Sequence, residues 1–360
     1  MDQPTKVRVH VAYVSGAPLR RYERDYVPQL LGELSQGSSA HRFEVETNPA
    51  AADLIVLWEG FEYKSPTYVD ILEQDPLIQK YADRICVINY DDHPEGFLAG
   101  LYTSLEQPFF DSRIHRIWPF FLMNNARVYN PPPDVASPER KWLFSFTGAV
   151  SHPIRRKIFD LYSESSSEYH VEHIKKWYDH GDGEKDHFIS VARNSSFCLC
   201  PHGYCSYTPR ITEVMALGRV PVIIADDWIP FSFEEKDPYY VQVPEKDLAN
   251  LPEILRARAK DAGEIGRNAR RLWEKYCSPE KRAAALIELA GTLIEGNYRM
   301  PGFEEYRERW HSSDFIRRVG WKPSQRIALR VEQHVRRVFP TARIPGVSDL
   351  MRYRNSVHKG

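Results

Sequence analysis

The chain has 360 residues, of which 42% are hydrophobic and 27% are charged, as in an ordinary soluble globular protein with room for two domains. A formal net charge of -1 excludes a protein that binds nucleic acid over its whole surface, since such binding needs a basic face. No apolar stretch approaches the ~20 residues of a membrane helix, and no signal peptide is visible. Five cysteines without a repeated spacing are typical of a reducing compartment, so we expect a cytoplasmic protein.

Strand and helix patterns alternate along the first third of the chain. Such alternation predicts a parallel sheet that is covered by helices. Ligands bind at the carboxyl ends of the strands in sheets of this kind. The predicted strands cover residues 7–14, 52–60 and 84–92, and the predicted helices cover residues 26–36 and 77–82.

Three consecutive prolines begin a linker over residues 131–140, because neither a helix nor a central strand continues through them. The alternation then restarts, which predicts the α/β class with two Rossmann-like, doubly wound domains that face a central cleft. The second half has predicted strands at residues 141–148, 196–200, 220–225 and 239–244, and helices at 152–164, 187–195, 208–218 and onward to about 296. We therefore expect an N-terminal domain over 1–130, a C-terminal domain over 141–300 and a helical extension over 301–360.

The C-terminal extension is basic. From Lys322 onward Lys and Arg greatly outnumber Asp and Glu, and residues 326–339 have helical periodicity. We favour a surface helix that packs back on the body of the protein. The alternative is a basic face that makes a peripheral contact with an anionic membrane.

Two parts of the sequence contain clusters of residues that could bind a metal ion. Cys198 and Cys200 lie on one face of a predicted strand, but Cys-X-Cys lacks the two-residue spacer of common zinc knuckles. Because free cysteine is often a buried hydrophobe, we favour core packing over metal binding. Residues 170–187 hold four histidines among acids, and their irregular spacing favours a polar surface loop over an ion site.

A helix start near residue 208 has the features of an anion site. Thr208 is a good N-cap and Pro209 suits the first helical position. Arg210 falls in the first turn, where its positive charge is unfavourable next to the positive end of the helix dipole. A bound phosphate would pair with the guanidinium and accept hydrogen bonds from the free N–H groups of the helix. Gly203 lets the backbone approach a ligand closely, and Glu213 is placed to accept hydrogen bonds from ribose hydroxyls. An intrahelical pair of Arg210 with Glu213 explains the spacing equally well.

Residues 196–231 resemble the signature block of the exostosin family, glycosyltransferase family 47. Residues 146–148 and the helix after them are similar to the family's Phe-X-Gly and Arg-initiated helix. The resemblance covers about residues 141–245, and the first 130 residues resemble the family only loosely. The matching motifs are Cys200-Pro201, Gly203, Thr208-Pro209-Arg210-Ile211-Thr212-Glu213, Gly218, Pro221-Val222-Ile223 and Pro230-Phe231.

The resemblance implies a GT-B fold, a nucleotide sugar held mainly by the C-terminal domain, and inversion at the sugar without a metal or other cofactor. By position, Arg210 would contact the diphosphate and Glu213 the ribose. UDP is the commonest donor nucleotide of the family. Asp226 and Asp227 would contact the donor or close the cleft, although turn chemistry also explains them. The remaining nucleotide-sugar residues would be Gly148, Arg155, His202, Gly203 and Thr208.

An inverting transfer also needs a base to accept the proton of the acceptor hydroxyl. Asp92 and His93, in the loop after the strand at 84–92, are our candidates, with Asp91 next and His10 and Glu59 weaker. A simple turn explains the same residues.

We therefore expect a soluble glycosyltransferase of bacterial or viral type that moves a UDP-linked sugar to a hydroxyl of a glycan or lipid-linked saccharide. Two alternatives remain: an inactive glycan-binding or scaffold partner, and a GDP-fucose-dependent enzyme.

Overall fold

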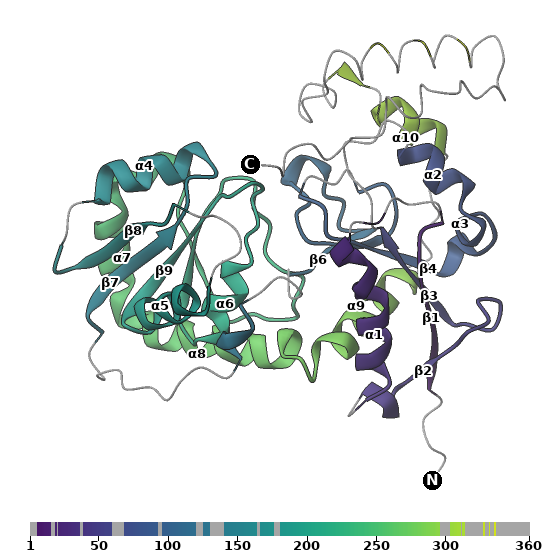
Figure 1. The fold of residues 1–360 in the computed structure, drawn as a ribbon, viewed down its shortest axis with the longest axis horizontal. Coiled ribbons are helices and arrows are strands. Elements are labelled where there is room, and N and C mark those ends of the chain that lie inside the picture. The colour runs from purple at the N-terminus through teal and green to yellow at the C-terminus, as the bar shows by residue number, and fades with distance from the viewer. Residues whose placement is uncertain are drawn as a thin grey trace.

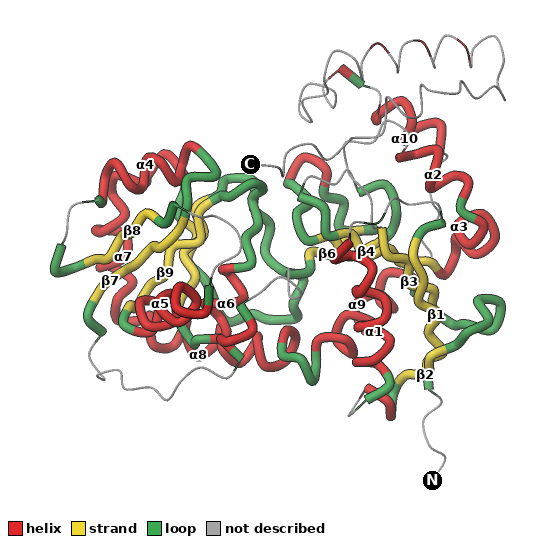
Figure 2. Tube along the Cα trace, viewed as in Figure 1, coloured by secondary structure: helices red, strands yellow, loops and turns green. Residues whose placement is uncertain are grey.

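The chain forms two α/β units that lie side by side, each with a parallel sheet between helices (Figure 1, Figure 2). The computed structural model describes residues 6–15, 19, 21–36, 39–59, 68–92, 96–119, 125–129, 140–163, 166–175, 181–295, 303–310 and 312–313, together with the isolated positions 327, 331 and 335.

The N-terminal sheet has six parallel strands in the order β2-β1-β3-β4-β5-β6. β3 and β4 are buried along their whole length, because helices cover both faces of a central parallel sheet. The strands are β1 (Val7–Tyr13), β2 (Phe43–Val45), β3 (Leu54–Glu59), β4 (Ile85–Asn89), β5 (Gly100–Tyr102) and β6 (His115–Ile117), with helices α1 (Tyr26–Leu34), α2 (Tyr68–Gln74) and α3 (Pro76–Tyr81).

The C-terminal sheet has five parallel strands in the order β11-β10-β9-β7-β8. The two parallel-sheet units form the GT-B architecture that the sequence predicts. The strands are β7 (Trp142–Gly148), β8 (Tyr169–His173), β9 (Ser195–Pro201), β10 (Val220–Ile224) and β11 (Val241–Gln242), with helices α4 (Pro153–Tyr162), α5 (Asp182–Arg193), α6 (Arg210–Ala216), α7 (Leu251–Arg258) and α8 (Ala262–Leu272).

The chain returns to the N-terminal unit after α8 (Figure 1). Helix α9 (Arg282–Ile294), which the sequence groups with the C-terminal half, packs against α1, β3 and β4. The buried Arg282 forms an ion pair with Glu33 of α1, and Arg282 Nε lies 2.9 Å from Glu33 Oε2. In α10 (Phe303–Trp310), the ring of Trp310 stacks on Tyr68 of α2 with centroids 4.7 Å apart. Helices from the end of the chain thus complete the N-terminal core.

Direct contacts also join the two units near β6. The backbone N–H of Ile117 donates to Ser232 Oγ at 2.9 Å, and the N–H of Ser232 donates to the carbonyl oxygen of Ile117 at 2.9 Å. The rings of Trp118 and Phe233 meet edge to face with centroids 6.0 Å apart. The segment after β10 is therefore hydrogen-bonded to the edge of the N-terminal sheet.

One local expectation is wrong, and two others lie outside the described residues. The surface loop predicted over 170–187 is regular structure at both ends, where β8 pairs with β7 and α5 begins at Asp182. The short β8 alternates Tyr169 and Val171, which pack against the core, with His170 and Glu172, but this alternation spans only a few residues beside a polar, Gly- and Lys-containing stretch. Most of the proline-rich linker and nearly all of the basic C-terminal segment fall outside the described residues. In the described part of the chain, no helix is both long and apolar enough to cross a membrane.

Candidate functional site

The start of α6 lies at the carboxyl ends of β7 and β9. The helix begins at Arg210, and Pro209 takes the cap position, one residue later than the sequence predicts. Thr208 Oγ1 accepts only a long hydrogen bond, at 3.4 Å, from the backbone N–H of Arg210. Pro209 already has helical backbone angles but is the cap residue, and the helix is assigned from Arg210. Differences of one residue at a helix boundary are common.

The Arg210 guanidinium sits between two aromatic rings. Its Cζ lies 5.1 Å from the ring centroid of Phe146 in β7 and 5.3 Å from that of Phe188 in α5. Two of its nitrogens, Nε and Nη1, are buried without a hydrogen-bond partner. Ring faces partly offset the cation, but unpaired buried N–H groups cost about 1–3 kcal/mol. An oxyanion at this position would remove that cost.

A second guanidinium, that of Arg155 in α4, lies over the same Phe146 ring at 5.7 Å. Burial, and then the charge of Arg210, lower the pKa of Arg155 to about 9. The two cations therefore repel each other, and an anion between them would be bound favourably. Arg155 itself is held by backbone carbonyls: Nε donates to His202 at 2.9 Å, Nη2 to Pro201 at 3.2 Å and Nη1 to Ala149 at 3.4 Å.

Two glycines leave room for this pair. A Cβ on Gly148 would lie 3.2 Å from Arg210 Nη1, and a Cβ on Gly203 would lie 2.8 Å from Arg155 Nη2. Any larger residue at position 203 would displace the guanidinium. The structure thus brings Gly148, Arg155, Gly203 and Arg210 together, as the sequence suggests.

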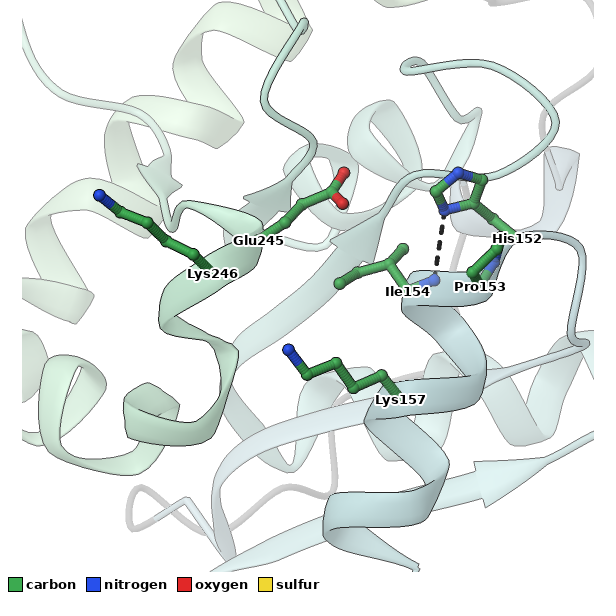
Figure 3. A pocket seen from close by; sticks show the side chains of 6 residues that line it. All are labelled: His152, Pro153, Ile154, Lys157, Glu245 and Lys246. Carbon is green, nitrogen blue, oxygen red and sulfur yellow. Dashed lines mark hydrogen bonds between the residues drawn. The ribbon is translucent and has the colours of Figure 1, made fainter.

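His202 lies beside them, and its ring stacks on that of His152 with centroids 4.0 Å apart. His152 caps α4 through a 3.3 Å hydrogen bond from the Ile154 N–H to Nδ1. Burial, then the neighbouring His202 and Arg155, lower the pKa of His152 to about 4, so the ring is neutral at pH 7. A shallow hollow of about 340 Å³ opens next to His152 (Figure 3). Its lining residues are His152, Pro153, Ile154, Lys157, Glu245 and Lys246.

Glu213 faces the segment 125–129, which precedes the proline-rich linker. Its Oε1 accepts a 2.7 Å hydrogen bond from the backbone N–H of Asn125. Asn125 Nδ2 also donates to the carbonyl oxygen of Lys185 in α5, at 3.4 Å. In the same segment Arg127 forms a two-pronged ion pair with Asp186, at 2.6 Å for each contact. Hydrogen bonds and an ion pair therefore join the segment 125–129 to α5 and α6 beside the arginine pair.

Asp226 and Asp227 follow β10, and both are exposed. Asp226 Oδ1 accepts a 3.0 Å hydrogen bond from the Glu245 N–H, and the carbonyl oxygen of Asp227 lies 3.4 Å from the N–H of Gln107. Asp226 thus fixes a turn within its own domain, while Asp227 contacts the N-terminal unit through its backbone.

On the N-terminal side, Asp92 reaches the loop before α6. Cys205 Sγ lies 3.6 Å from Asp92 Oδ1 and 3.2 Å from Ser104 Oγ, so this carboxylate approaches the C-terminal unit near the arginine pair. Asp92 is half-buried, whereas Asp91 is buried. His93 lies outside the described residues.

Glu59, the weaker candidate base at the end of β3, sits in a buried hydrogen-bonded network. Tyr68 donates its hydroxyl to Oε1 at 2.8 Å, and Asn89 Nδ2 donates to Oε2 at 2.6 Å. Asn89 Oδ1 in turn accepts the N–H of Asp91 at 2.9 Å. Burial raises the pKa of Glu59 to about 7, although the hydrogen bonds from Asn89 and Tyr68 act against it. The network positions the Asp91–Asp92 backbone.

This network predicts a pH-dependent stability. Because the pKa of Glu59 rises from 4.5 in the unfolded chain to about 7 in the folded protein, the folded state binds more protons between these values. The free energy of unfolding should therefore fall as pH rises from 4.5 to 7, by on the order of 3 kcal/mol from this group, and level off above pH 7. Glu59→Gln should remove that slope in urea unfolding curves measured at pH 4.5–8. Equal pH slopes in the variant and the parent protein would contradict the prediction.

The cysteines of the same region belong to the core. Cys198, Cys200 and Cys205 are all buried, and burial raises the pKa of each thiol. Cys198 and Cys200 share the face of β9 that packs with α5 and α6 residues, as the period of two predicts.

The region that contains the arginine pair matches a known protein family. Residues 94–258 match the Exostosin GT47 domain. The chain carries an exostosin GT47 domain. The family predicted from the 196–231 block is therefore confirmed. The match contains every candidate donor residue from Gly148 to Asp227, whereas Asp92 lies two residues before its start.

Curated relatives of the exostosin domain match only in part. A rice (Oryza sativa subsp. japonica) protein named probable glucuronosyltransferase is 44% identical over 70 residues, which is 19% of this chain and 16% of the relative. The exostosin-1 homolog of Caenorhabditis elegans is 27% identical over 219 residues, which is 50% of this chain and 55% of the relative. This chain thus spans about half or less of these relatives.

Solved structures also align with the chain. A crystal structure of an α1,3-fucosyltransferase has a TM-score of 0.43 and 12% identity, and the alignment covers 84% of this chain and 95% of that one. The Anabaena protein Alr3699/HepE in complex with UDP has a TM-score of 0.39 and 12% identity, over 80% and 100% of the two chains. Because both scores are low, the fold assignment rests on the two sheets described above.

Several site residues have no clear signal in the sequence. Phe146 is the exception, because it belongs to the Phe-X-Gly motif that ends at Gly148. Phe188 comes from α5 and Asn125 from the segment 125–129, and only the packing of these segments brings them to Arg210 and Glu213.

Proposed function

We propose that this exostosin domain is part of an inverting glycosyltransferase that uses a nucleotide sugar, most simply a UDP-sugar. The observation that carries the proposal is the pair of guanidiniums over Phe146, in which Arg210 has two buried N–H groups without a partner. A diphosphate offers the two negative charges and the acceptor oxygens that this pair lacks.

The leaving group is the nucleoside diphosphate. As the bond between the sugar C1 and the phosphate oxygen breaks, negative charge grows on the diphosphate, and Arg210 donates its two buried N–H groups to it. Arg155 adds charge from the neighbouring position and holds the 201–203 backbone in place. Glu213, which accepts a hydrogen bond from the backbone of Asn125, also accepts hydrogen bonds from the ribose hydroxyls.

The acceptor hydroxyl attacks C1 from the opposite side, and Asp92 takes its proton. The contact of Asp92 with Cys205 supports this role, since it brings a carboxylate of the N-terminal unit to the loop that leads to Arg210. The acceptor is a hydroxyl of a glycan or of a lipid-linked saccharide. His93, next to Asp92 in the chain, is the second candidate for the base.

The first test is donor turnover. Curated relatives are named glucuronosyltransferases and xylosyltransferases, so the donor panel contains UDP-glucuronic acid and UDP-xylose together with UDP-glucose, UDP-N-acetylglucosamine and GDP-fucose. We expect slow UDP release from at least one UDP-sugar, and faster release with a saccharide acceptor mixture. UDP binding without any release would favour an inactive scaffold, and competition by GDP alone would indicate a GDP-sugar enzyme.

A further inference from the structure

A group of three side chains lies away from the arginine pair, on the outer strand of the C-terminal sheet. His170 and Glu172 of β8 point to one face, because side chains two apart on a strand do so, and His187 comes from α5. His187 Nε2 lies 2.6 Å from Glu172 Oε2, and His170 Nε2 lies 3.2 Å from the same oxygen. Within the described residues, one potential ligand atom from each of the three lies within 4.8 Å of the others.

This set has the chemistry of a zinc site. Two imidazoles and one carboxylate, with a water in the fourth position, are a common arrangement around Zn²⁺. With Zn–N and Zn–O bonds of about 2.0–2.2 Å, tetrahedral ligand atoms lie roughly 3.3 Å apart, so the observed contacts need only small side-chain rotations. Exposed fractions of 29%, 42% and 47% for His170, Glu172 and His187 leave a path for the ion from solvent.

Neighbouring contacts support the strand and the helix that carry these side chains. The ring of His170 lies against Trp142 with centroids 4.7 Å apart. In α5, the residue before His187 is Asp186, whose carboxylate accepts two hydrogen bonds from Arg127 of the segment 125–129. A ligand set built on a strand and a helix is more rigid than one on a loop.

We propose that His170, Glu172 and His187 bind Zn²⁺, or a divalent ion of the same class, and that the ion joins β8 to α5. In the described sheet β8 pairs with β7 alone, so it is held on one side only. A bound ion would add a second attachment. It would also stabilise the helix whose Phe188 covers Arg210, so its loss would loosen one wall of the arginine site. The proposal does not depend on glycosyl transfer.

The test is ZnCl₂ titration of the full chain, with any purification tag removed, by isothermal titration calorimetry and thermal unfolding. We expect one site, and a Tm raised by roughly 3–4 °C when Zn²⁺ is about a hundredfold above its Kd. Glu172→Gln and His187→Ala should each weaken binding by about tenfold or more, because each loses one of three protein ligands.

His173→Ala provides the matched control. His173 belongs to the same strand but lies against Phe159 of α4, on the other face of the sheet, with ring centroids 5.0 Å apart. This variant should bind Zn²⁺ as the parent protein does. Absence of Zn²⁺ binding to the parent protein in a titration that reaches about 100 μM Zn²⁺ would overturn the proposal. Equal binding by the parent protein, Glu172→Gln and His187→Ala would do so too, because the ion would then lie elsewhere.

Discussion

Arg210→Met is expected to abolish donor binding and, at the same time, to make the unliganded protein more stable. Methionine retains most of the length of the side chain between Phe146 and Phe188 but removes the charge and the two buried N–H groups without a partner. Relief of that desolvation should raise the free energy of unfolding by about 1 kcal/mol. Loss of charge-assisted bonds to the diphosphate should lower kcat/KM by roughly 10²–10³-fold.

The two effects have opposite signs, which separates a binding residue from a structural one. Calorimetric binding of UDP and urea unfolding of the apoprotein measure them. Arg219→Met is the matched control, because Arg219 follows the other end of α6 and donates from Nε to the carbonyl oxygen of Arg193 at 3.2 Å. This control should lose stability and bind UDP as before. An Arg210→Met protein that binds UDP with unchanged affinity would remove the basis of the proposed donor site.

Asp92→Asn is expected to suppress transfer by roughly 10²–10⁴-fold while UDP affinity stays within about twofold of the parent protein. The reason is positional: Asp92 belongs to the N-terminal unit and reaches Cys205, whereas the arginine pair that meets the diphosphate belongs to the C-terminal unit. Steady-state transfer assays and UDP calorimetry on the same preparation provide the two readouts.

Asp91→Asn distinguishes the two neighbouring acids. Asp91 is buried, and its backbone is fixed by Asn89, so we expect its substitution to act on stability more than on the chemical step. If Asp91→Asn lost transfer and Asp92→Asn retained it, the base would have to be reassigned. Full activity in both variants would point to His93 or to a residue outside this loop.

The sequence alone was sufficient for the central elements of the C-terminal unit. β7 is predicted to the residue at its end, Gly148, and β9 and β10 lie within one residue of their predicted bounds. These strands are apolar runs bounded by glycine, proline and polar residues, and such signals are local. The position of Arg210 in the first turn of α6 follows from the same kind of local pattern, because Thr208 and Pro209 mark a helix start.

Tertiary structure alone decided which residues meet at the site. Phe188, Asn125 and Cys205 lie 22, 85 and 5 positions from Arg210 along the chain, and nothing in their own neighbourhoods marks them as partners of Arg210, Glu213 or Asp92. The same holds for α9. Its apolar residues could cover either sheet, and only the tertiary structure shows that they pack against the N-terminal one. Periodicity determines which face of an element is buried, but sheet order and strand register determine what that face is buried against.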